Sequence, residues 1–246
     1  MLPEKLPIEL KKLSLNLKGR LQFSTQSSSE NDQAPLSSEE FKRFVELSRC
    51  LRTFDLANLK MASEKLAFWI NLYNSLTIHA ILVYHLKRTV WDVPHFFDCA
   101  AYDIDGWRFS LNDIENGILR GNRAAPYHLF PPFSSKDPRK KFALTLKEFD
   151  PRVHFALNCG SRSCPPIEFY DPFYIDQQLD KAARAFIQST TRIQGNQLIL
   201  SSIFKWYHGD FGNLKIFISG YLLPELRSQL KGKRIVFSQY DWSLSE

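Results

Sequence analysis

The sequence predicts a single α+β domain that is rich in helix and carries a small, mainly antiparallel sheet. Three observations lead to this fold class: long segments have helical spacing of apolar residues, the segments with strand alternation are short and scattered, and the chain has no internal repeat. Regular alternation of strands and helices would instead indicate a parallel, doubly wound sheet. The 246 residues are 44% hydrophobic and 14% aromatic, which is enough apolar material for one large core.

The first 35 residues are expected to form a flexible N-terminal arm and polar linker. The linker STQSSSENDQAP, at residues 24–35, has too few apolar residues to contribute to a core. The domain is therefore expected at residues 36–246. The opening MLPEKLPIELKK lacks the apolar stretch of a secretory signal. We therefore expect a soluble protein in the reducing cytoplasm, with free thiols.

Two helices are predicted at the start of the domain. Ser37 and Glu40 have the spacing of a capping box before a helix over about residues 38–52. Ser63 is the expected N-cap of a second helix, which runs to about residue 87. That helix has apolar residues on nearly all sides, as in a helix buried within a protein.

The second helix also resembles a membrane span in length. Residues 66–86 carry no formal charge and would reach across a bilayer. A narrow polar stripe of Asn71, Asn74 and Ser75 runs along it, however, and buried amides must find hydrogen-bond partners. We therefore expect no membrane span but a core helix whose polar stripe faces a polar network or a cleft.

The remaining elements are predicted to be short. Asp105-Gly106 lies between alternating segments and is typical of a two-residue hairpin turn. The other expected elements are, in order, a helix at residues 111–119 capped by Asn112, a strand at 152–158, a helix at 176–190, a strand at 198–200, short helices on either side of Pro224, and a strand at 235–238.

The segment HFALNCGSRSCPPI, at residues 154–167, has the strongest chemical pattern. Cys159 and Cys164 flank a turn that contains Gly160, and the amides of this turn together with Arg162 could lower the pKa of a thiol or receive an anion. Four interpretations of the pair remain open: inert buried thiols, a reactive nucleophile, a redox pair or a metal site.

The predicted strand restricts the choice of a base for Cys159. Side chains alternate between the two faces of a strand, so His154 is expected to point away from Cys159. A base should then come from elsewhere in the chain. The other two cysteines, Cys50 and Cys99, are expected to be structural.

Five segments in order carry a family resemblance: AFWINLYNSLTIHAIL, LNDIENGILRGNR, HFALNCGSRSCPPI, FKWYHGDFG and YDWSL. Over about residues 40–246 the chain resembles the uncharacterised family numbered 547 among the domains of unknown function. The resemblance implies that the polar motifs converge on one site. The matching positions are Asn71, Tyr73, Asn74, His79, Glu115, Arg120, Cys159, Gly160, Ser161, Cys164, Trp206, Tyr207, Asp210, Tyr240, Asp241 and Trp242.

Two departures from the family pattern affect the choice of catalytic residues. Many relatives have histidine where this chain has Asn116, so a histidine at that position is not a general feature of the family. Some relatives have serine where this chain has Cys164, which makes Cys159 the better candidate for a shared nucleophile. Similar chains attached to glutaredoxin-like domains imply thiol chemistry, and others beside coiled-coil or signalling segments imply binding.

The expected function is a cysteine-dependent hydrolase or transferase that acts on an amide, peptide or thiol-containing small molecule. Such an enzyme needs a nucleophile, a base, a group that orients the base, and donors for an oxyanion. The candidates are Cys159 as nucleophile with Cys164 beside it, His79 as base, Glu115 or Asp210 as orienting group, and Asn71, Asn74 or the amides of the Gly160–Ser163 turn as donors.

A non-catalytic module that binds a ligand or a protein, with structural cysteines, is the alternative. The ligand in either case is expected to be a small molecule or peptide. Its contacts are expected from Tyr73, Arg120, Ser161, Arg162 and Asp210. Arg120 and Arg162, with Arg123, could form an anion site, although arginines also clamp loops together.

Other classes of partner are not expected. The chain has no Gly-rich turn between a strand and a helix, so no nucleotide cofactor is expected, and no cysteine or histidine pairs complete a metal site. The net charge is only +6, and the basic loop SSKDPRKK, at residues 134–141, is not part of a nucleic-acid motif. We therefore expect no metal, no cofactor and no nucleic-acid partner.

Overall fold

The computed structural model describes residues 34–126 and 128–244, together with Glu9 and Lys12. Nearly all of the N-terminal arm expected at residues 1–35 lies outside these residues. The fold is α+β with short strands, as the sequence predicts. The helices are α2 (Ala34–Ser37), α3 (Glu39–Cys50), α4 (Ala62–Val83), α5 (Phe96–Cys99), α6 (Ile175–Thr190), α7 (Ile203–Trp206), α8 (His208–Phe211), α9 (Leu214–Ser219) and α10 (Pro224–Ser228).

The described strands form two small sheets, in which one strand pair is parallel and the others are antiparallel. The first sheet is the antiparallel pair β1 (Ala101–Ile104) and β2 (Trp107–Ser110). The second has the order β3-β4-β5, in which β3 (Arg192–Gln194) is antiparallel and β5 (Arg234–Phe237) parallel to β4 (Gln197–Leu200). A π-helix at Asp113–Leu119 and five 3₁₀-helices complete the described elements, the latter at Leu51–Thr53, Leu56–Asn58, Val90–Asp92, Pro138–Phe142 and Pro151–Phe155.

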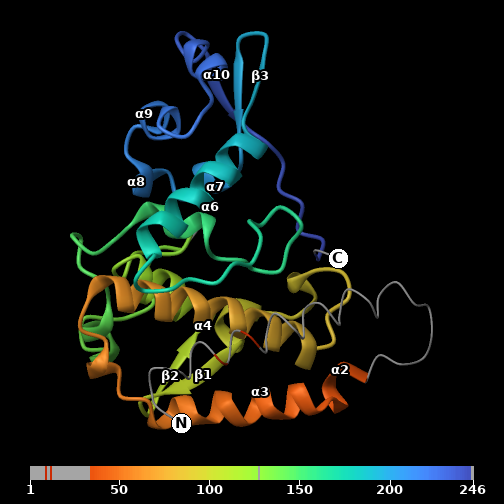
Figure 1. Ribbon diagram of the computed structural model, residues 1–246, viewed down its shortest axis with the longest axis vertical. Helices are drawn as coiled ribbons and strands as arrows, with labels where there is room; N and C mark the ends of the chain where they lie inside the picture. The colour runs from red at the N-terminus through yellow and green to blue at the C-terminus, as the bar shows by residue number, and fades with distance from the viewer. Residues whose placement is uncertain (1–8, 10–11, 13–33, 127, 245–246) are drawn as a thin grey trace.

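The molecule has a lower part built on α3, α4 and the first sheet, and an upper part that holds α7 to α10 and the second sheet (Figure 1). Each part has its own cluster of buried apolar side chains, and α6 contributes to both. Leu179 lies in the lower cluster, whereas Ala183 and Phe186, one and two turns later, lie in the upper one. Because a single helix supplies both clusters, the two parts form one domain.

Helix α4 is the centre of the lower part, as its all-round apolar pattern predicts. It is the one described helix that is long and apolar enough to cross a membrane, and 83% of its most apolar window is buried inside the protein. Trp69, Ile70 and Tyr73 are at most 1% exposed. The expected core helix is therefore present, with its polar stripe buried among other elements.

Two helix N-termini differ from the predicted caps. Helix α3 is capped by Ser38, whose hydroxyl accepts from the amide of Phe41, and not by Ser37. Helix α4 begins after Met61, because the Glu64 carboxylate accepts from the amides of residues 60 and 61. The predicted cap Ser63 lies inside that helix. Each correction moves the N-cap by one or two residues.

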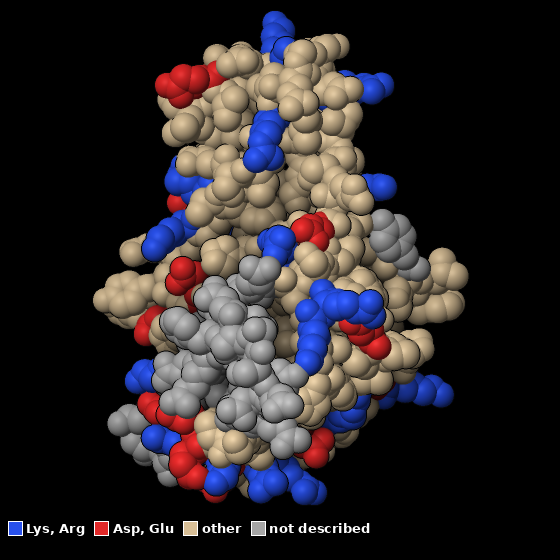
Figure 2. Space-filling view, turned by 90° about the vertical axis from the view of Figure 1, so that its right-hand side faces the viewer, with Lys and Arg blue, Asp and Glu red and all other residues tan. Residues whose placement is uncertain are grey.

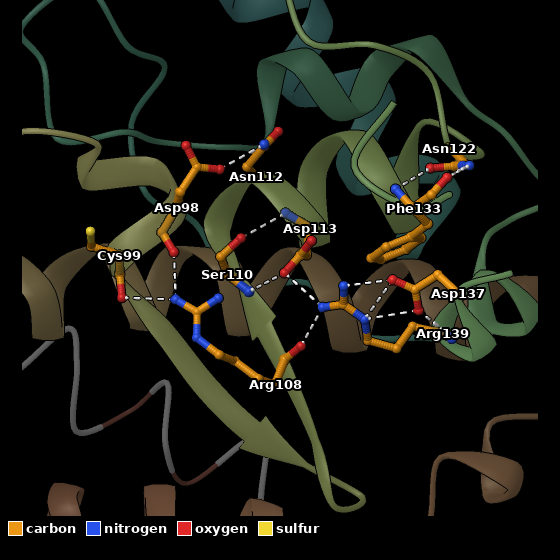
Figure 3. Close-up of polar contacts among 10 residues, drawn as sticks. All are labelled: Asp98, Cys99, Arg108, Ser110, Asn112, Asp113, Asn122, Phe133, Asp137 and Arg139. Carbon is orange, nitrogen blue, oxygen red and sulfur yellow. Dashed lines mark hydrogen bonds and ion pairs between the residues drawn. The ribbon is translucent and has the colours of Figure 1, made fainter. Parts of the chain in front are cut away.

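The segment predicted as a helix at residues 111–119 begins with a reciprocal cap at Ser110. The Ser110 amide donates to the Asp113 carboxylate, and the Asp113 amide donates to the Ser110 hydroxyl. Figure 3 shows this pair, with Arg139 bridging Asp113 and Asp137 and with Asn112 bonded to Asp98. Asn112 stands at the N-cap position of the π-helix, but its side chain makes no capping bond. Arg139, from the basic loop, holds two elements together.

The hairpin turn at Asp105-Gly106 is confirmed. These residues have φ angles of 51° and 73°, as a two-residue turn with two positive φ angles requires. The predicted helix at 176–190 is also confirmed by α6, and the predicted strands at 198–200 and 235–238 correspond to β4 and β5.

The predicted strand at residues 152–158 is wrong. Pro151–Phe155 is a 3₁₀-helix, and the following residues have no regular structure. Asp150 accepts a hydrogen bond from the Arg152 amide, and Pro151 provides the fixed φ of a first helical residue. Every residue from 153 to 158 is buried, so the alternation in sequence did not reflect alternate burial.

The C-terminal segment, residues 238–244, leaves β5 and runs down to the lower part (Figure 1). Isolated bridges join Ser243 to Thr89 and Leu244 to Ser161. The Trp242 ring packs against Trp91 and Trp206, with centroid separations of 4.9 and 5.4 Å. The segment thus joins both parts of the molecule.

A chain that ends at Ser238 should be less stable than the full chain, because it loses the packing of Tyr240 and Trp242. The partly buried rings contribute about 3 kcal/mol together, equivalent to a fall in melting temperature of roughly 6–12 °C for a domain of this size. Differential scanning fluorimetry measures this change, and a chain that ends at Leu244 is the control. Equal melting temperatures for the chains ending at Ser238 and Leu244 would contradict the docking role.

Candidate functional site

A cavity of about 420 Å³ lies where the upper and lower parts meet. Its wall is built from α4, α5, the π-helix, the loop around Pro126, the cysteine loop (residues 156–165), α7 and the C-terminal segment. Most of its lining is apolar and aromatic. A cavity of this size, with a few polar groups in an apolar wall, suits a small-molecule or side-chain ligand.

Two asparagines of α4 fix the irregular segments beside the cavity. The Asn74 amide donates to the Ala156 carbonyl at 3.0 Å, and its oxygen accepts from the Asn158 amide at 2.9 Å. Asn71 makes the same pair of hydrogen bonds with the backbone carbonyl and amide of Tyr170, at 2.7 and 3.1 Å. Asn71 and Asn74 therefore satisfy buried backbone groups, and they are not in the cavity wall.

The cysteine loop turns sharply at Gly160. Gly160 has a φ of +91°, and a Cβ at this position would lie 2.6 Å from Cδ1 of Ile81. The Asn158 side chain supports the turn by accepting from the Gly160 amide at 2.7 Å and donating to the Pro165 carbonyl at 2.6 Å. The loop therefore holds Cys159 and Cys164 together at the wall of the cavity.

The two thiols are in direct contact. Their Sγ atoms are 2.9 Å apart, and both cysteines are free and partly exposed. Sγ of Cys164 also accepts a hydrogen bond from the Cys159 amide at 3.2 Å and lies 3.1 Å from the Tyr240 hydroxyl. The Ser161 hydroxyl lies 3.2 Å from the same sulfur. Sγ of Cys164 is thus surrounded by four hydrogen-bonding groups, of which the Cys159 amide can only donate.

These contacts separate the acidities of the two thiols. Burial alone would raise the pKa of Cys164, but the hydrogen bonds that this thiol makes with Cys159, Ser161 and Tyr240 outweigh burial and lower this pKa to about 6. The hydrogen bond to Cys164, burial and the negative charge on Cys164 raise the pKa of Cys159 well above its ordinary value. The contacts therefore favour the thiolate form at Cys164 and the protonated form at Cys159.

Tyr240 stays protonated beside the thiolate. Burial, followed by the charges of the two cysteines, raises the pKa of Tyr240. Its hydroxyl accepts from Ser161 at 3.0 Å, which leaves the phenol proton for Cys164. The thiolate is therefore stabilised by neutral donors.

Glu115 lies in the same cavity and is held by two phenols. The Tyr73 hydroxyl donates to Oε2 of Glu115 at 3.0 Å, and the Tyr207 hydroxyl donates to Oε1. Burial, and then the nearby Glu115 charge, raise the pKa values of Tyr73 and Tyr207, so both phenols remain donors. Tyr73 comes from α4 and Tyr207 follows α7, so the carboxylate joins the lower and upper parts.

Behind Tyr207 lies an ion cluster around Asp210. Its carboxylate accepts from Nε of Arg120 at 2.6 Å, from Arg123 at 2.6 Å and from Nε2 of His154 at 2.9 Å. Burial would raise the pKa of Asp210, but the bonds from His154 and Arg120 lower it. An anion at Arg120 and Arg123 would have to displace Asp210, whose side chain is only 3% exposed.

His154 is a cavity residue that the predicted strand excluded. Its ring stacks on Tyr207 with a centroid separation of 3.9 Å. Burial lowers the pKa of His154 more than Asp210 raises it, so the ring is neutral. Because an ionised carboxylate only accepts, Nε2 carries the proton and Nδ1 is left unprotonated.

His79 lies away from the cavity. Nδ1 of His79 is 2.9 Å from the Tyr102 hydroxyl, and the ring packs edge-on against Phe41 and Phe44. Burial lowers the pKa of His79 to about 4. The residue predicted as the base is thus a neutral histidine in the packing between α3, α4 and the first sheet.

The structure brings four predicted site residues to the cavity wall: Tyr73, Glu115, Cys159 and Cys164. Ser161 and Asp210 lie just behind it, since Ser161 contacts Cys164 and Asp210 holds His154. The structure does not bring Asn71, Asn74, His79, Arg120 or Arg162 to the wall. Arg162 is exposed, and its amide donates to the Ser243 carbonyl.

Most other wall residues were missing from the predicted site, among them His154, Tyr207 and Tyr240. Tyr207 and Tyr240 were among the positions that match the family pattern, and that pattern was the only sequence signal for them. His154 was set aside by the strand assignment. Cys50 and Cys99, expected to be structural, are exposed at the ends of α3 and α5.

The described residues contain no group of three or more His, Cys, Asp or Glu side chains arranged to hold a metal ion. Lys and Arg are scattered over the face shown in Figure 2, with Asp and Glu between them.

Comparison with known proteins gives one match. A family model described as "Protein of unknown function, DUF547" matches residues 56–187, which is more than half of the chain. The matched segment includes α4, the π-helix and the cysteine loop but ends before Tyr207 and Tyr240. No curated protein and no solved structure matches the chain.

Replacing Asn74 with alanine should release the cysteine loop. The change leaves the Ala156 carbonyl and the Asn158 amide without their partner, at a cost of about 2–4 kcal/mol. Urea unfolding measures the loss, and hydrogen exchange at the Asn158 amide should become faster. Asn71→Ala is the matched control: it should destabilise the fold similarly but speed exchange at Tyr170. Equal exchange at Asn158 in both variants would contradict the assignment.

His79 should make the fold sensitive to acid. Its folded pKa of about 4 lies below the roughly 6.5 of an unfolded histidine, so the unfolded chain binds the extra proton as the pH falls from 6.5 to 4. Stability is therefore lost over this range, by about 3 kcal/mol. His79→Gln should lack this component in urea unfolding at pH 7 and pH 4, whereas His208→Gln, at an exposed position, should keep it. An unchanged pH dependence in His79→Gln would show that this histidine is not the cause.

Proposed function

We propose a function for this chain on the premise that it belongs to the DUF547 family of proteins of unknown function. In this proposal it is a cysteine-dependent hydrolase or transferase that acts on an amide, peptide or thiol-containing small molecule. The observation that carries the proposal is the set of hydrogen-bond donors around Sγ of Cys164, at the wall of a 420 Å³ cavity. An inert, packed cysteine has neither an accessible cavity nor a lowered pKa.

The nucleophile in this proposal is Cys164. The sequence favoured Cys159, because some relatives have serine in place of Cys164. In this chain, however, the Cys159 amide donates to Sγ of Cys164, and the Tyr240 hydroxyl lies 3.1 Å from this sulfur but 3.9 Å from that of Cys159. We therefore take Cys164 as the acceptor of the pair. A thiolate is the attacking form of a cysteine, so the acceptor of the pair is the reactive residue.

The proposed reaction begins when the Cys164 thiolate attacks the carbonyl carbon of the substrate. An S–C bond and a tetrahedral oxyanion form. The Tyr240 hydroxyl and the Cys159 amide no longer donate to a thiolate, so they can donate hydrogen bonds to the oxyanion. The C–N bond then breaks, and the leaving amine takes the proton of the Cys159 thiol. A thioester remains on Cys164.

In the second half, water attacks the thioester for hydrolysis, or an amine or thiol attacks it for transfer. The attacking group returns a proton to Cys159, and the Cys164 thiolate leaves. We assign the proton transfers to Cys159 because its sulfur lies 2.9 Å from the nucleophile. His154, by contrast, is bonded through Nε2 to Asp210 and stacks on Tyr207. His154 is therefore a positioning residue, which supports Tyr207 by stacking.

Thiol–disulfide exchange is a second candidate, and the same 2.9 Å separation of the sulfurs favours it. A disulfide substrate would be attacked by the Cys164 thiolate to give a mixed disulfide and one free thiol. Cys159, after losing its proton, would then close the Cys159–Cys164 disulfide and release the second thiol. The substrate gains two electrons, and the cysteine pair loses them.

Alkylation with iodoacetamide across pH 5 to 9, with each cysteine followed by mass spectrometry, tests the proposal. Cys164 should react with a midpoint near pH 6, because its thiolate is already formed there. Tyr240→Phe should raise that midpoint by about one unit, since it removes one donor to the thiolate. Cys50 and Cys99, which do not line the cavity, provide internal references.

If Cys159 and Cys164 both react only after unfolding, the proposed thiol chemistry is wrong. The two candidate functions separate when the protein is treated with a small-molecule disulfide. Rapid formation of the internal disulfide, at the rate of the first attack, supports exchange. A mixed disulfide that persists on Cys164 argues against exchange and for acyl chemistry.

A further inference from the structure

We infer that the substrate of this cavity carries an alkylammonium group, which Glu115 and the aromatic wall bind. The inference rests on the proposed function only in using the same cavity, and it adds the chemical class of the substrate. The class is a protonated aliphatic amine, either on a small molecule or at the end of a lysine side chain.

The charges at the cavity wall are negative. Among the described residues that line the cavity, the carboxylates are Glu115 and Asp98, and none is a Lys or Arg. Asp98 is exposed, and its carboxylate is held by Asn112 at 2.8 Å (Figure 3), so it lies at the outer part of the wall. The Cys164 thiolate adds a further negative charge above its titration point. A cation therefore complements this wall better than an anion does.

Glu115 is held by neutral groups. Its described hydrogen-bond partners are the phenols of Tyr73 and Tyr207, each of which uses one lone pair of a different carboxylate oxygen. Every carboxylate oxygen can accept two hydrogen bonds, so both oxygens keep a position for an N–H donor of a ligand. An ammonium would thus make charge-assisted hydrogen bonds to a carboxylate that is already fixed in orientation.

The nearest arginines do not reverse this preference. Arg120 and Arg123 are both bonded to the Asp210 carboxylate, and the Arg120 side chain is only 7% exposed. Arg120 lies over the Tyr207 ring at 4.8 Å from its centroid and is not a lining residue. A ligand in the cavity therefore meets Glu115 directly, whereas the guanidinium is already paired with a carboxylate.

The aromatic wall suits the same ligand. Trp91, Trp206, Tyr240 and Trp242 form one cluster in the lining, with neighbouring centroids 4.6 to 5.4 Å apart. Indole and phenol faces attract cations, because the ring quadrupole places negative charge on the face. The rings also cover the methylene groups of an alkyl chain, so an alkylammonium matches both the charge and the apolar surface.

Isothermal titration calorimetry at pH 7 with three probes of equal chain length tests the inference. Hexylamine is protonated at this pH, 1-hexanol is neutral and hexanoate is an anion. Hexylamine should bind at least tenfold more tightly than either of the others. Equal or tighter binding of 1-hexanol or hexanoate would overturn the inference, and this comparison needs no variant protein.

Glu115→Gln tests the role of the carboxylate. Glutamine keeps an oxygen for a tyrosine hydroxyl but removes the charge, so hexylamine affinity should fall at least tenfold while 1-hexanol affinity stays unchanged. Glu46→Gln, on the exposed face of α3, is the matched control and should leave both affinities unchanged. An unchanged hexylamine affinity in folded Glu115→Gln would overturn the assignment of the carboxylate.

Two further ligands distinguish the sources of the ammonium. 1,4-Diaminobutane represents small amines, and a blocked lysine (Nα-acetyl-lysine N-methylamide) represents a lysine side chain. The ligand that binds with the higher affinity identifies the source. If neither binds, the inference is wrong for both sources.

Failure of this inference and failure of the proposed function give different results. Binding needs no reaction at sulfur. Tighter binding of hexylamine than of 1-hexanol and hexanoate, in a protein whose Cys159 and Cys164 do not react with iodoacetamide, would therefore refute only the thiol chemistry. A reactive Cys164 in a protein that prefers hexanoate would refute only the ammonium class.

Discussion

The double hydrogen bond between Asn74 and the backbone of residues 156 and 158 is the constraint on which the site depends. The chain around Cys159 has no strand or helix to hold it, so its buried backbone groups need partners from elsewhere. Helix α4 supplies them at 3.0 and 2.9 Å, and the same helix fixes the lower core. A helix that is apolar on nearly every side thus tolerates asparagines because they replace the hydrogen bonds that a strand would have provided.

The acidity of Cys164 requires the C-terminal segment as well as the cysteine loop. The loop provides the Cys159 amide and thiol, whereas Tyr240 comes from a segment attached to the upper part. The bridges of Ser243 and Leu244 keep that segment against Thr89 and Ser161. Stability and reactivity are therefore coupled here: a change that frees the C-terminal segment also removes a donor from the thiolate and so raises its pKa.

The sequence predicted the elements whose patterns are local and missed the features that depend on long-range contacts. Helix α4 and the Asp105-Gly106 turn follow from apolar periodicity and from turn chemistry alone. The strand expected at 152–158 failed because a buried stretch with apolar residues at every second position resembles a strand, while Asp150-Pro151 starts a 3₁₀-helix. His154 was lost with it. The choice between Cys159 and Cys164 depends on Tyr240, about 80 residues away, which no local pattern contains.

The negative charge at the cavity wall depends on which carboxylate pairs with Arg120 and Arg123. In sequence, Arg120 and Arg123 look available for an anion, because Glu115 lies five residues before Arg120 and does not form a good i,i+4 pair with it. The fold brings Asp210 from α8 to both guanidinium groups and leaves Glu115, five residues before Arg120, with only phenols as described partners. A buried arginine needs a carboxylate, since an unpaired buried charge is costly. Asp210 meets that need and so leaves the Glu115 carboxylate to face the cavity and whatever cation enters it.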